Sequence, residues 1–298
     1  MPAVAVNNVC KSFGDKLVVN DVSFSVALGE IFGLIGPNGA GKTTTIRMMM
    51  DIIKPDSGEI NILGENLSEA TKNGIGYLPE ERGLYKKISV LESLVYLASL
   101  KGISASWARS RAEELLRRVD LLPHKGKRIE ELSRGMGQLI QFLVTIIHDP
   151  RLVILDEPFA GLDPVNTELL KEIILELRSR DKAFILSTHQ MNQVEELCDR
   201  ILMINHGHSV LYGELATIKN KYRNNSVLVD IEGELGQLDG VVSSRKEGKY
   251  IELFLDGKTP PQKVLQQIVN QGIAVNHFEV TTPTLHQIFI QVAGESSE

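Results

Sequence analysis

The chain has 298 residues, a net charge of -6 at pH 7 and two cysteines. Its length suits one large or two ordinary domains, and its negative charge disfavours a dedicated nucleic-acid surface. No uninterrupted apolar run reaches about 18 residues, the length of a membrane span, and the first residues lack the features of a secretory signal. We therefore expect a cytoplasmic protein in which Cys10 and Cys198 are reduced thiols.

The first 35 residues predict short strands joined by polar turns, at residues 4–13, 17–26 and 31–35. Phe13 stands beside a turn between the first two strands, where it could stack on an adenine, although simple packing is more usual for such a residue. The third strand leads into GPNGAGKTTT, residues 36–45, which fits the pattern G-x-x-x-x-G-K-[ST] between a strand and a helix. This is the pattern of a phosphate-binding loop.

Three glycines give this loop its chemistry, because Gly36, Gly39 and Gly41 can adopt positive φ and turn backbone N–H groups around a phosphate. A helix expected over residues 46–53 adds the positive end of its dipole. Lys42 adds a full charge, and Thr43 supplies an oxygen suited to Mg²⁺. The predicted ligand is a magnesium nucleoside triphosphate.

The middle of the chain is predicted to be largely helical. A strand at residues 74–78 is followed by segments with helical periodicity at residues 89–100 and 104–122. Ser133 is a good N-cap for a further helix that runs toward Ile147. These segments indicate a helical insert.

A continuous apolar strand at residues 152–155 ends in Asp156 and Glu157. Such a strand is typical of a parallel sheet buried on both faces, and ligands bind at the carboxyl ends of its strands. The two carboxylates should therefore face the phosphate-binding loop, although a capping or turn role is the alternative. A helix at residues 165–178 and a second buried strand at residues 183–187 follow, and this strand leads to His189, which is either structural or functional there.

The composition changes near residues 212–225. Strands at residues 226–235, 241–256 and 273–280, with helices at residues 260–269 and 283–292, predict a small α+β module without a catalytic constellation.

Five segments resemble, in this order, the motifs of the ATP-binding subunits of ATP-binding cassette (ABC) transporters. They are GPNGAGKTT, LSRGM for the LSGGQ signature, LVILDEP for Walker B, AGLDP for the D-loop and STH for the switch histidine. The resemblance implies an α/β P-loop NTPase cassette over residues 1–215, with a mixed or parallel sheet and a helical insert at about residues 85–148. Residues 216–298 form the accessory α+β domain. GYLPEERGLY and this domain resemble the branch paired with sodium, drug or antibiotic exporters.

The resemblance also implies a role for each matching residue. Lys42 reaches the β and γ phosphates, and Thr43 and Asp156 hold Mg²⁺. Glu157 is the general base for water, and His189 contacts the γ-phosphate. The residues expected around ATP are Phe13, Gly36, Pro37, Asn38, Gly39, Ala40, Gly41, Lys42, Thr43, Thr44, Ser133, Gly135 and Asp163.

In the family, the signature segment closes on the ATP of a second subunit. The resemblance therefore implies a homodimer, or a heterodimer with a related cassette, in the ATP-bound state, with Ser133, Gly135 and Asp163 at the shared interface. It also implies a separate integral-membrane permease that docks near residues 80–85, so that the chain works on the inner face of the cell membrane. Nucleic acid is not expected as a partner.

Two departures from the family pattern concern the site. Glu80 stands where glutamine is usual, and a carboxylate there could bind Mg²⁺ but would repel the γ-phosphate. Arg134 and Met136 replace glycine and glutamine of the signature, and Arg134 either meets the other subunit's phosphates or points to solvent.

Two other functions compete with a transport ATPase. One is a soluble ABC-type ATPase acting on ribosomes or DNA, but such proteins generally have tandem cassettes or a long coiled-coil insertion. The other is a regulatory ATP-binding module, which the presence of Glu157 and His189 disfavours.

Overall fold

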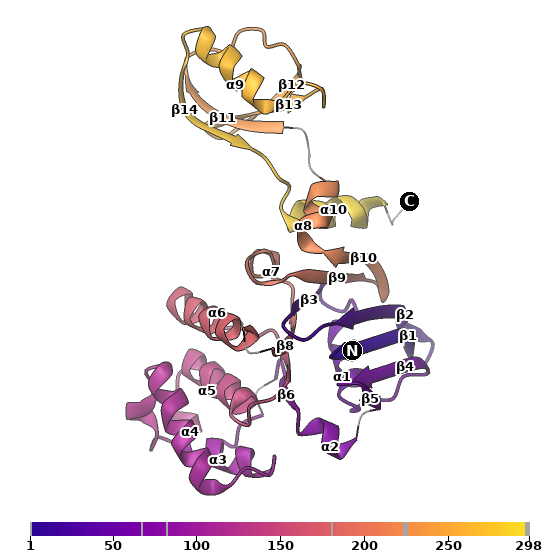
Figure 1. The fold of residues 1–298 in the computed structure, drawn as a ribbon, viewed down its shortest axis with the longest axis vertical. Coiled ribbons are helices and arrows are strands. Elements are labelled where there is room, and N and C mark those ends of the chain that lie inside the picture. The colour runs from indigo at the N-terminus through magenta and orange to yellow at the C-terminus, as the bar shows by residue number, and fades with distance from the viewer. Residues whose placement is uncertain (1, 67, 82, 180, 223–225, 296–298) are drawn as a thin grey trace. The chain divides into compact units, whose positions relative to one another are not determined.

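The computed structural model describes residues 2–66, 68–81, 83–179, 181–222 and 226–295 (Figure 1). The chain forms two compact units, Met1–Leu215 and Ala216–Glu298. Among the described residues, no helix is long and apolar enough to cross a membrane.

A six-stranded sheet forms the centre of the first unit, in the order β10-β9-β3-β8-β7-β6. Neighbouring strands are parallel except β10, which runs antiparallel to β9. Every residue of β3 and β7 is buried, as the apolar runs predicted. The strands are β3 (Ile31–Ile35), β6 (Ile75–Leu78), β7 (Leu152–Asp156), β8 (Ala183–Thr188), β9 (Arg200–Asn205) and β10 (His208–Glu214).

A second, antiparallel sheet has the order β2-β1-β4-β5. Its strands are β1 (Val4–Phe13), β2 (Lys16–Val26), β4 (Ser57–Ile62) and β5 (Glu65–Asn66). Apolar residues of both sheets and of helix α1 (Lys42–Met49) form one core. Helix α1 begins and ends four residues earlier than the helix expected at residues 46–53. Its start is set by Gly41, which precedes it in a left-handed conformation, and its end by Asp51, which at φ 57° cannot continue it.

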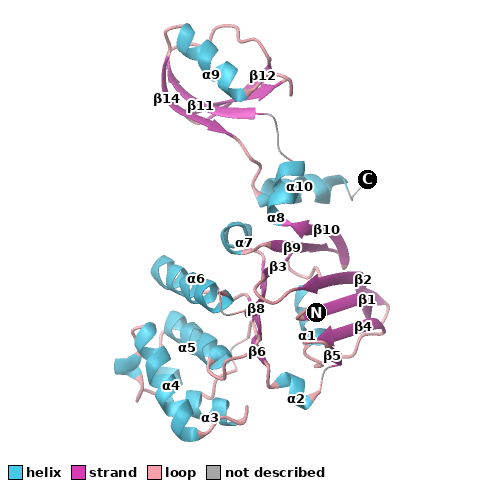
Figure 2. Cartoon of the chain, viewed as in Figure 1, coloured by secondary structure: helices cyan, strands magenta, loops and turns pink. Residues whose placement is uncertain are grey.

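Helices α3 (Val90–Ser99), α4 (Ala105–Arg118) and α5 (Arg134–Ile146) pack together beside the six-stranded sheet (Figure 2). Ser89 and Glu92 cap α3 reciprocally, and Ser133 caps α5 as predicted. The helix expected over residues 104–122 ends at Arg118 instead, because Asp120 has φ 54°. The remaining helical elements are α2 (Glu69–Lys72), η1 (Leu122–His124), η2 (Ile129–Glu131), α6 (Pro164–Arg178) and α7 (Met191–Leu197).

The second unit is an α+β module, as predicted. Its antiparallel sheet has the order β12-β13-β11-β14, and α9 packs on β14. Helix α8 (Leu215–Lys221) lies where we expected a break in the pattern, and residues 223–225 of that stretch lie outside the described residues. The other elements are β11 (Ser226–Glu232), β12 (Val241–Glu247), β13 (Tyr250–Leu255), α9 (Pro261–Asn270), β14 (Ala274–Val280) and α10 (Leu285–Glu295).

Candidate active site

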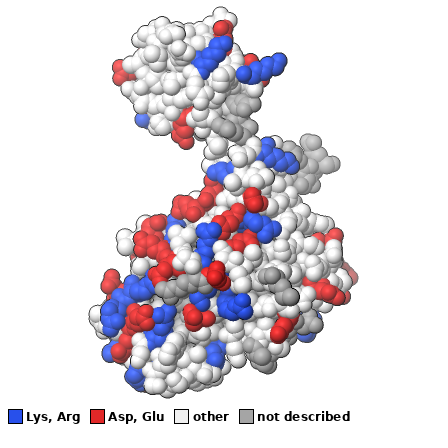
Figure 3. Space-filling view, viewed as in Figure 1, with Lys and Arg blue, Asp and Glu red and all other residues white. Residues whose placement is uncertain are grey.

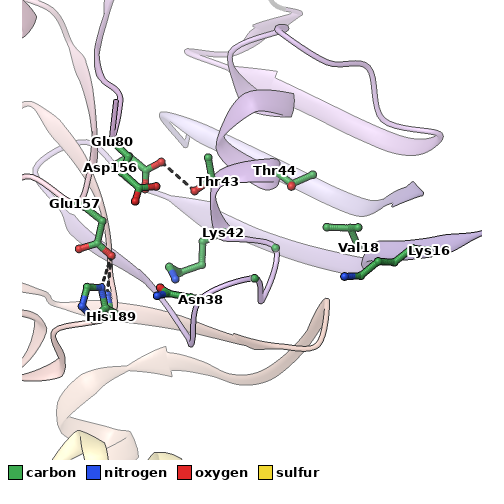
Figure 4. A pocket seen from close by; sticks show the side chains of 12 residues that line it. Lys16, Val18, Asn38, Lys42, Thr43, Thr44, Glu80, Asp156, Glu157 and His189 are labelled. Atoms are coloured by element: carbon green, nitrogen blue, oxygen red, sulfur yellow. Dashed lines mark hydrogen bonds and ion pairs between the residues drawn. The ribbon is translucent and has the colours of Figure 1, made fainter. Parts of the chain in front are cut away.

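A pocket of about 390 Å³ opens at the carboxyl ends of β3, β6, β7 and β8 (Figure 4). Parallel strands bring their carboxyl ends to one edge of a sheet, so residues far apart in sequence meet there. The pocket is lined by Lys16, Val18, Asn38, Gly39, Gly41, Lys42, Thr43, Thr44, Glu80, Asp156, Glu157 and His189.

The glycines of the phosphate-binding loop have positive φ, as predicted: 148° at Gly36, 77° at Gly39 and 112° at Gly41. At Gly36 a Cβ atom would lie 2.1 Å from the carbonyl oxygen of Ile204, and at Gly41 it would lie 2.7 Å from that of Val18. Only glycine fits at these two positions, because the loop backbone is pressed against the end of β9 and against β2.

The N-terminus of α1 points into the pocket without a side-chain cap. Its first N–H groups have no partner within the helix and are available to an anion. Lys42 is buried, and its Nζ donates to the carbonyl oxygens of Gly36 and Pro37 at 2.8 and 3.1 Å. Burial lowers the pKa of Lys42, and the carboxylates lining the pocket oppose that shift.

The Thr43 hydroxyl and the Asp156 carboxylate lie next to each other at the pocket. Thr43 Oγ1 donates to Asp156 Oδ2 at 3.1 Å, whereas the buried Oδ1 of Asp156 has no hydrogen-bond partner among the described residues. Burial raises the pKa of Asp156, the neighbouring hydroxyls of Ser187 and Thr43 oppose that shift, and the nearby charges of Glu80 and Glu157 add to it. A buried carboxylate oxygen without a partner fits a cation. Because the described part of the chain holds no group of three His, Cys, Asp or Glu residues able to bind a metal, this cation would need further oxygens from its ligand.

Glu157 follows β7 in a left-handed conformation, with φ 51°. Its Oε2 accepts from Thr188 Oγ1 at 3.0 Å, and its Oε1 accepts from the backbone N–H of His189 at 3.0 Å. The Nδ1 atom of His189 lies 2.7 Å from the same Oε1. The carboxylate is 9% exposed and the His189 ring 53% exposed, so the ring borders solvent while it holds Glu157 in place.

Other predicted residues lie beside the pocket or away from it. Gly36 and Pro37 contribute carbonyl groups behind Lys42, and Ala40 is buried in the loop. Phe13 is 51% exposed and pairs across the hairpin with Lys16, which lines the pocket, while Lys11 Nζ lies 5.7 Å from its ring centre.

The predicted signature and D-loop residues do not line this pocket. Ser133 Oγ accepts from the backbone N–H of Met136 at 3.2 Å. Asp163 accepts from the backbone N–H of Asn166 at 2.9 Å, and this bond lowers the pKa of Asp163. Ser133 and Asp163 are exposed, and a Cβ at Gly135 would lie 3.5 Å from the Gly161 carbonyl oxygen. The starts of α5 and α6 thus form a separate exposed region.

Sequence reasoning missed Lys16 and Val18, which line the pocket, and Thr188, which holds Glu157. The alternation of β2 was the only available signal for the first two, since residues two apart on a strand share a face. Nothing local in the sequence links β2 to the phosphate-binding loop.

The family model described as "ABC transporter" matches residues 19–160, and the one described as "ATP-binding protein DrrA1-3-like, C-terminal domain" matches residues 213–293. The chain is 37% identical to the uncharacterized ABC transporter ATP-binding protein YhaQ of Bacillus subtilis, over 98% of either protein. It is 34% identical to the Nod factor export ATP-binding protein I of a Rhizobium species, over 99% of this chain and 98% of the relative. A solved ATP-binding subunit of an ABC transporter superposes with a TM-score of 0.70 at 31% identity, covering 74% of this chain and 93% of that structure.

Proposed function

Because the chain belongs to the family of ABC transporter ATP-binding proteins, we propose that it hydrolyses ATP and powers export through a separate membrane permease. The observation that carries this proposal is the placement of the Glu157 carboxylate, held by Thr188 and His189, in the same pocket as Lys42. The name of the Nod factor export relatives supports the outward direction. The proposed site of action is the inner face of the cell membrane.

The phosphate-binding loop and α1 hold the triphosphate. Backbone N–H groups of the loop surround the phosphates, and Lys42 exchanges its bonds to loop carbonyls for the β and γ phosphates. Thr43 and Asp156 fit Mg²⁺, because their oxygens are adjacent and Asp156 Oδ1 has no partner in the described structure. When bound, this ion would neutralise part of the phosphate charge. Phe13 stacks on the adenine at the edge of the pocket, next to Lys16.

Glu157 is the general base of the reaction. It orients a water molecule and takes its proton while the water oxygen attacks the γ-phosphorus, and the bond from that phosphorus to the bridging oxygen breaks to give ADP and phosphate. Thr188 and His189 hold the carboxylate, and the exposed part of the His189 ring contacts the γ-phosphate.

A second copy completes the site. Ser133 and Gly135 begin a long helix whose positive end is exposed and does not line the nucleotide pocket of its own chain, so it suits the γ-phosphate held by another chain. Asp163 caps α6 two residues after Gly161, whose carbonyl oxygen lies close to Gly135. ATP would thus hold two chains together, and hydrolysis would loosen them.

A groove of about 620 Å³ supports permease docking near residues 80–85, of which residue 82 lies outside the described residues. Tyr85 and Tyr96 meet edge to face there, and both rings are about half exposed. Partly exposed aromatic side chains are typical anchors of protein interfaces. The groove is lined by Tyr85, Lys86, Lys87, Ile88, Glu92 and Tyr96.

Nucleic acid has little support as a partner. On the face in Figure 3, acidic and basic side chains of the first unit are interspersed, whereas nucleic-acid surfaces gather basic residues on one face.

Two measurements on the full chain test the proposal. The purified protein should hydrolyse ATP only with Mg²⁺ present. The tagged protein should also capture a membrane protein with several apolar spans from a membrane extract, and a Tyr85→Ala, Tyr96→Ala variant should lose that protein while it keeps ATP binding. Capture of ribosomes or DNA without a membrane protein would contradict the transport function.

A further inference from the structure

Helix α5 has two buried glutamines on its packed face. Gln138 and Gln141 are 5% and 4% exposed, within a largely apolar segment. Glutamine is seldom this buried, and a buried amide needs hydrogen-bond partners. Neither residue lines the nucleotide pocket, so their role lies in what they bind.

Gln141 binds the backbone on both sides of Glu80. Its Nε2 donates to the carbonyl oxygens of Pro79 and Glu81, each at 3.2 Å. The buried Oε1 of Gln141 has no hydrogen-bond partner within the part of the chain that the structure describes. The hydrogen bonds of this amide are therefore devoted to residues 79–81.

Strand β6, which leads into residues 79–81, packs closely on the same helix. A Cβ at Gly76 would lie 2.2 Å from the carbonyl oxygen of Thr145, so only glycine allows this approach. Thr145 Oγ1 donates to the Gln141 carbonyl oxygen at 2.9 Å, on the side of α5 that meets β6. The backbone before Glu80 is thus fixed to α5 by packing, and the backbone around it by Gln141.

The Glu80 side chain has no such support. It is exposed at the pocket, and its charge reaches Lys42 and Asp156, where it affects both pKa values. No hydrogen bond or ion pair to its carboxylate is found among the described residues. The place of this charge is therefore set by its backbone, and that backbone is held by Gln141.

We infer that Gln141 is a positioning residue, which holds Glu80 in the nucleotide pocket and ties it to the helix that begins at Ser133. This inference rests on the proposed ATPase function.

A double-mutant cycle tests this link, since it isolates the part of an effect that needs both residues. Gln141→Met has nearly the volume of the original side chain but no donor, and it should lower kcat about three- to tenfold, the effect of losing one or two neutral hydrogen bonds. In a Glu80→Ala background, the same substitution should change kcat less than about twofold. Gln138→Met is the matched control, because its Nε2 donates instead to the Pro158 carbonyl oxygen at 3.0 Å. Any effect of this control should persist in the Glu80→Ala background.

An effect of Gln141→Met that persists without Glu80, or no effect at all, would overturn the inference. Thermal melting establishes that each variant is folded, and Gln141→Asn, which shortens the side chain by one methylene, replaces Gln141→Met if that variant unfolds. Amide hydrogen exchange gives a readout that does not need turnover. Peptides covering residues 79–81 should exchange faster in the Gln141 variant and not in the Gln138 variant, and equal rates would also overturn the inference. A wild-type protein without ATPase activity would instead refute the proposed function.

Discussion

The two helices that begin at glycine-containing motifs, α1 and α5, differ in how their N-termini are completed. Helix α1 begins after Gly41, has no side-chain cap and opens into a pocket that Asp156 also lines. Helix α5 begins after Ser133, whose hydroxyl caps it, and its start is exposed and does not line that pocket.

Under the proposed function, this difference separates a ligand site within one chain, at α1, from a surface at α5 that meets the nucleotide of a second chain. An uncapped helix start in a pocket has donors in place for an anion, so α1 needs only its nucleotide. The start of α5 is capped and exposed, so it has no enclosed site for an anion, and under the proposed function its anion is a phosphate held by a second chain.

The substitution with the largest expected effect removes only the general base and leaves both helix starts intact. Glu157→Gln should keep ATP affinity within about twofold and lower kcat about 100- to 10,000-fold, since general-base catalysis contributes about that much. Steady-state phosphate release and equilibrium ATP binding measure the two quantities. Turnover at the wild-type rate would show that another group takes the proton.

The next effect concerns the charge at the start of α1. Lys42→Ala should weaken ATP binding about 30- to 100-fold, because it removes a charge-assisted contact to the phosphates in a buried site. Calorimetry with the isolated chain measures this affinity. Unchanged affinity would place the nucleotide elsewhere, and Lys16→Ala, at the pocket edge, provides a comparison in which a smaller loss is expected.

The pocket at α1 should also reduce the stability of the empty protein. Asp156 has a raised pKa, so the folded state binds its proton more tightly than the unfolded state does. The free energy of unfolding therefore falls as pH rises from the ordinary value of 3.8 through the raised pKa, and stays lowered at neutral pH. Asp156→Asn should raise the free energy of unfolding at pH 7 by about 1 kcal/mol.

Urea denaturation without nucleotide measures this difference at pH 7, and it should vanish well below the ordinary pKa of 3.8, where both states bind the proton. Asp163→Asn is the control, since hydrogen bonds lower the pKa of Asp163 and its replacement should not stabilise the protein. A wild-type protein as stable as Asp156→Asn at pH 7 would contradict the account of this pocket.

The smallest effect lies at the start of α5. Ser133→Ala removes an N-cap and should lower the free energy of unfolding by about 1 kcal/mol. ATP affinity of the isolated chain should not change, because Ser133 does not line the pocket. A loss of affinity comparable to that of Lys42→Ala would mean that α5 contributes to the site of its own chain.

The fold was predictable where local pattern and burial agree. Strand β3 and residues 152–155 of β7 are apolar because both faces of the sheet are covered. The start of α1 was misplaced because its first turn is Lys-Thr-Thr-Thr, which has no apolar periodicity, so the loop decides where the helix begins. Strand β10 and helix α8 were missed. Residues 208–214 are only partly buried, and they form a strand because they pair with β9.

The site residues likewise divide into those that a local pattern predicts and those that depend on tertiary packing. Lys42, Asp156 and Glu157 were predictable because each directly follows a buried strand or a glycine loop, and parallel strands bring those ends together. Lys16 and Val18 reach the pocket only because a separate sheet packs beside the loop. The hydrogen bonds from Gln141 to residues 79–81 join segments about 60 residues apart, and no local pattern indicates them.

The measurement that tests the central claim most directly is the mass of Glu157→Gln with ATP and Mg²⁺, by size-exclusion chromatography with light scattering. If the start of α5 serves the nucleotide of another chain, this variant should have the mass of one chain without nucleotide and of two chains with it. Adding Ser133→Arg should restore the mass of one chain without loss of ATP binding. A Glu157→Gln protein that binds ATP and keeps the mass of one chain would contradict the claim.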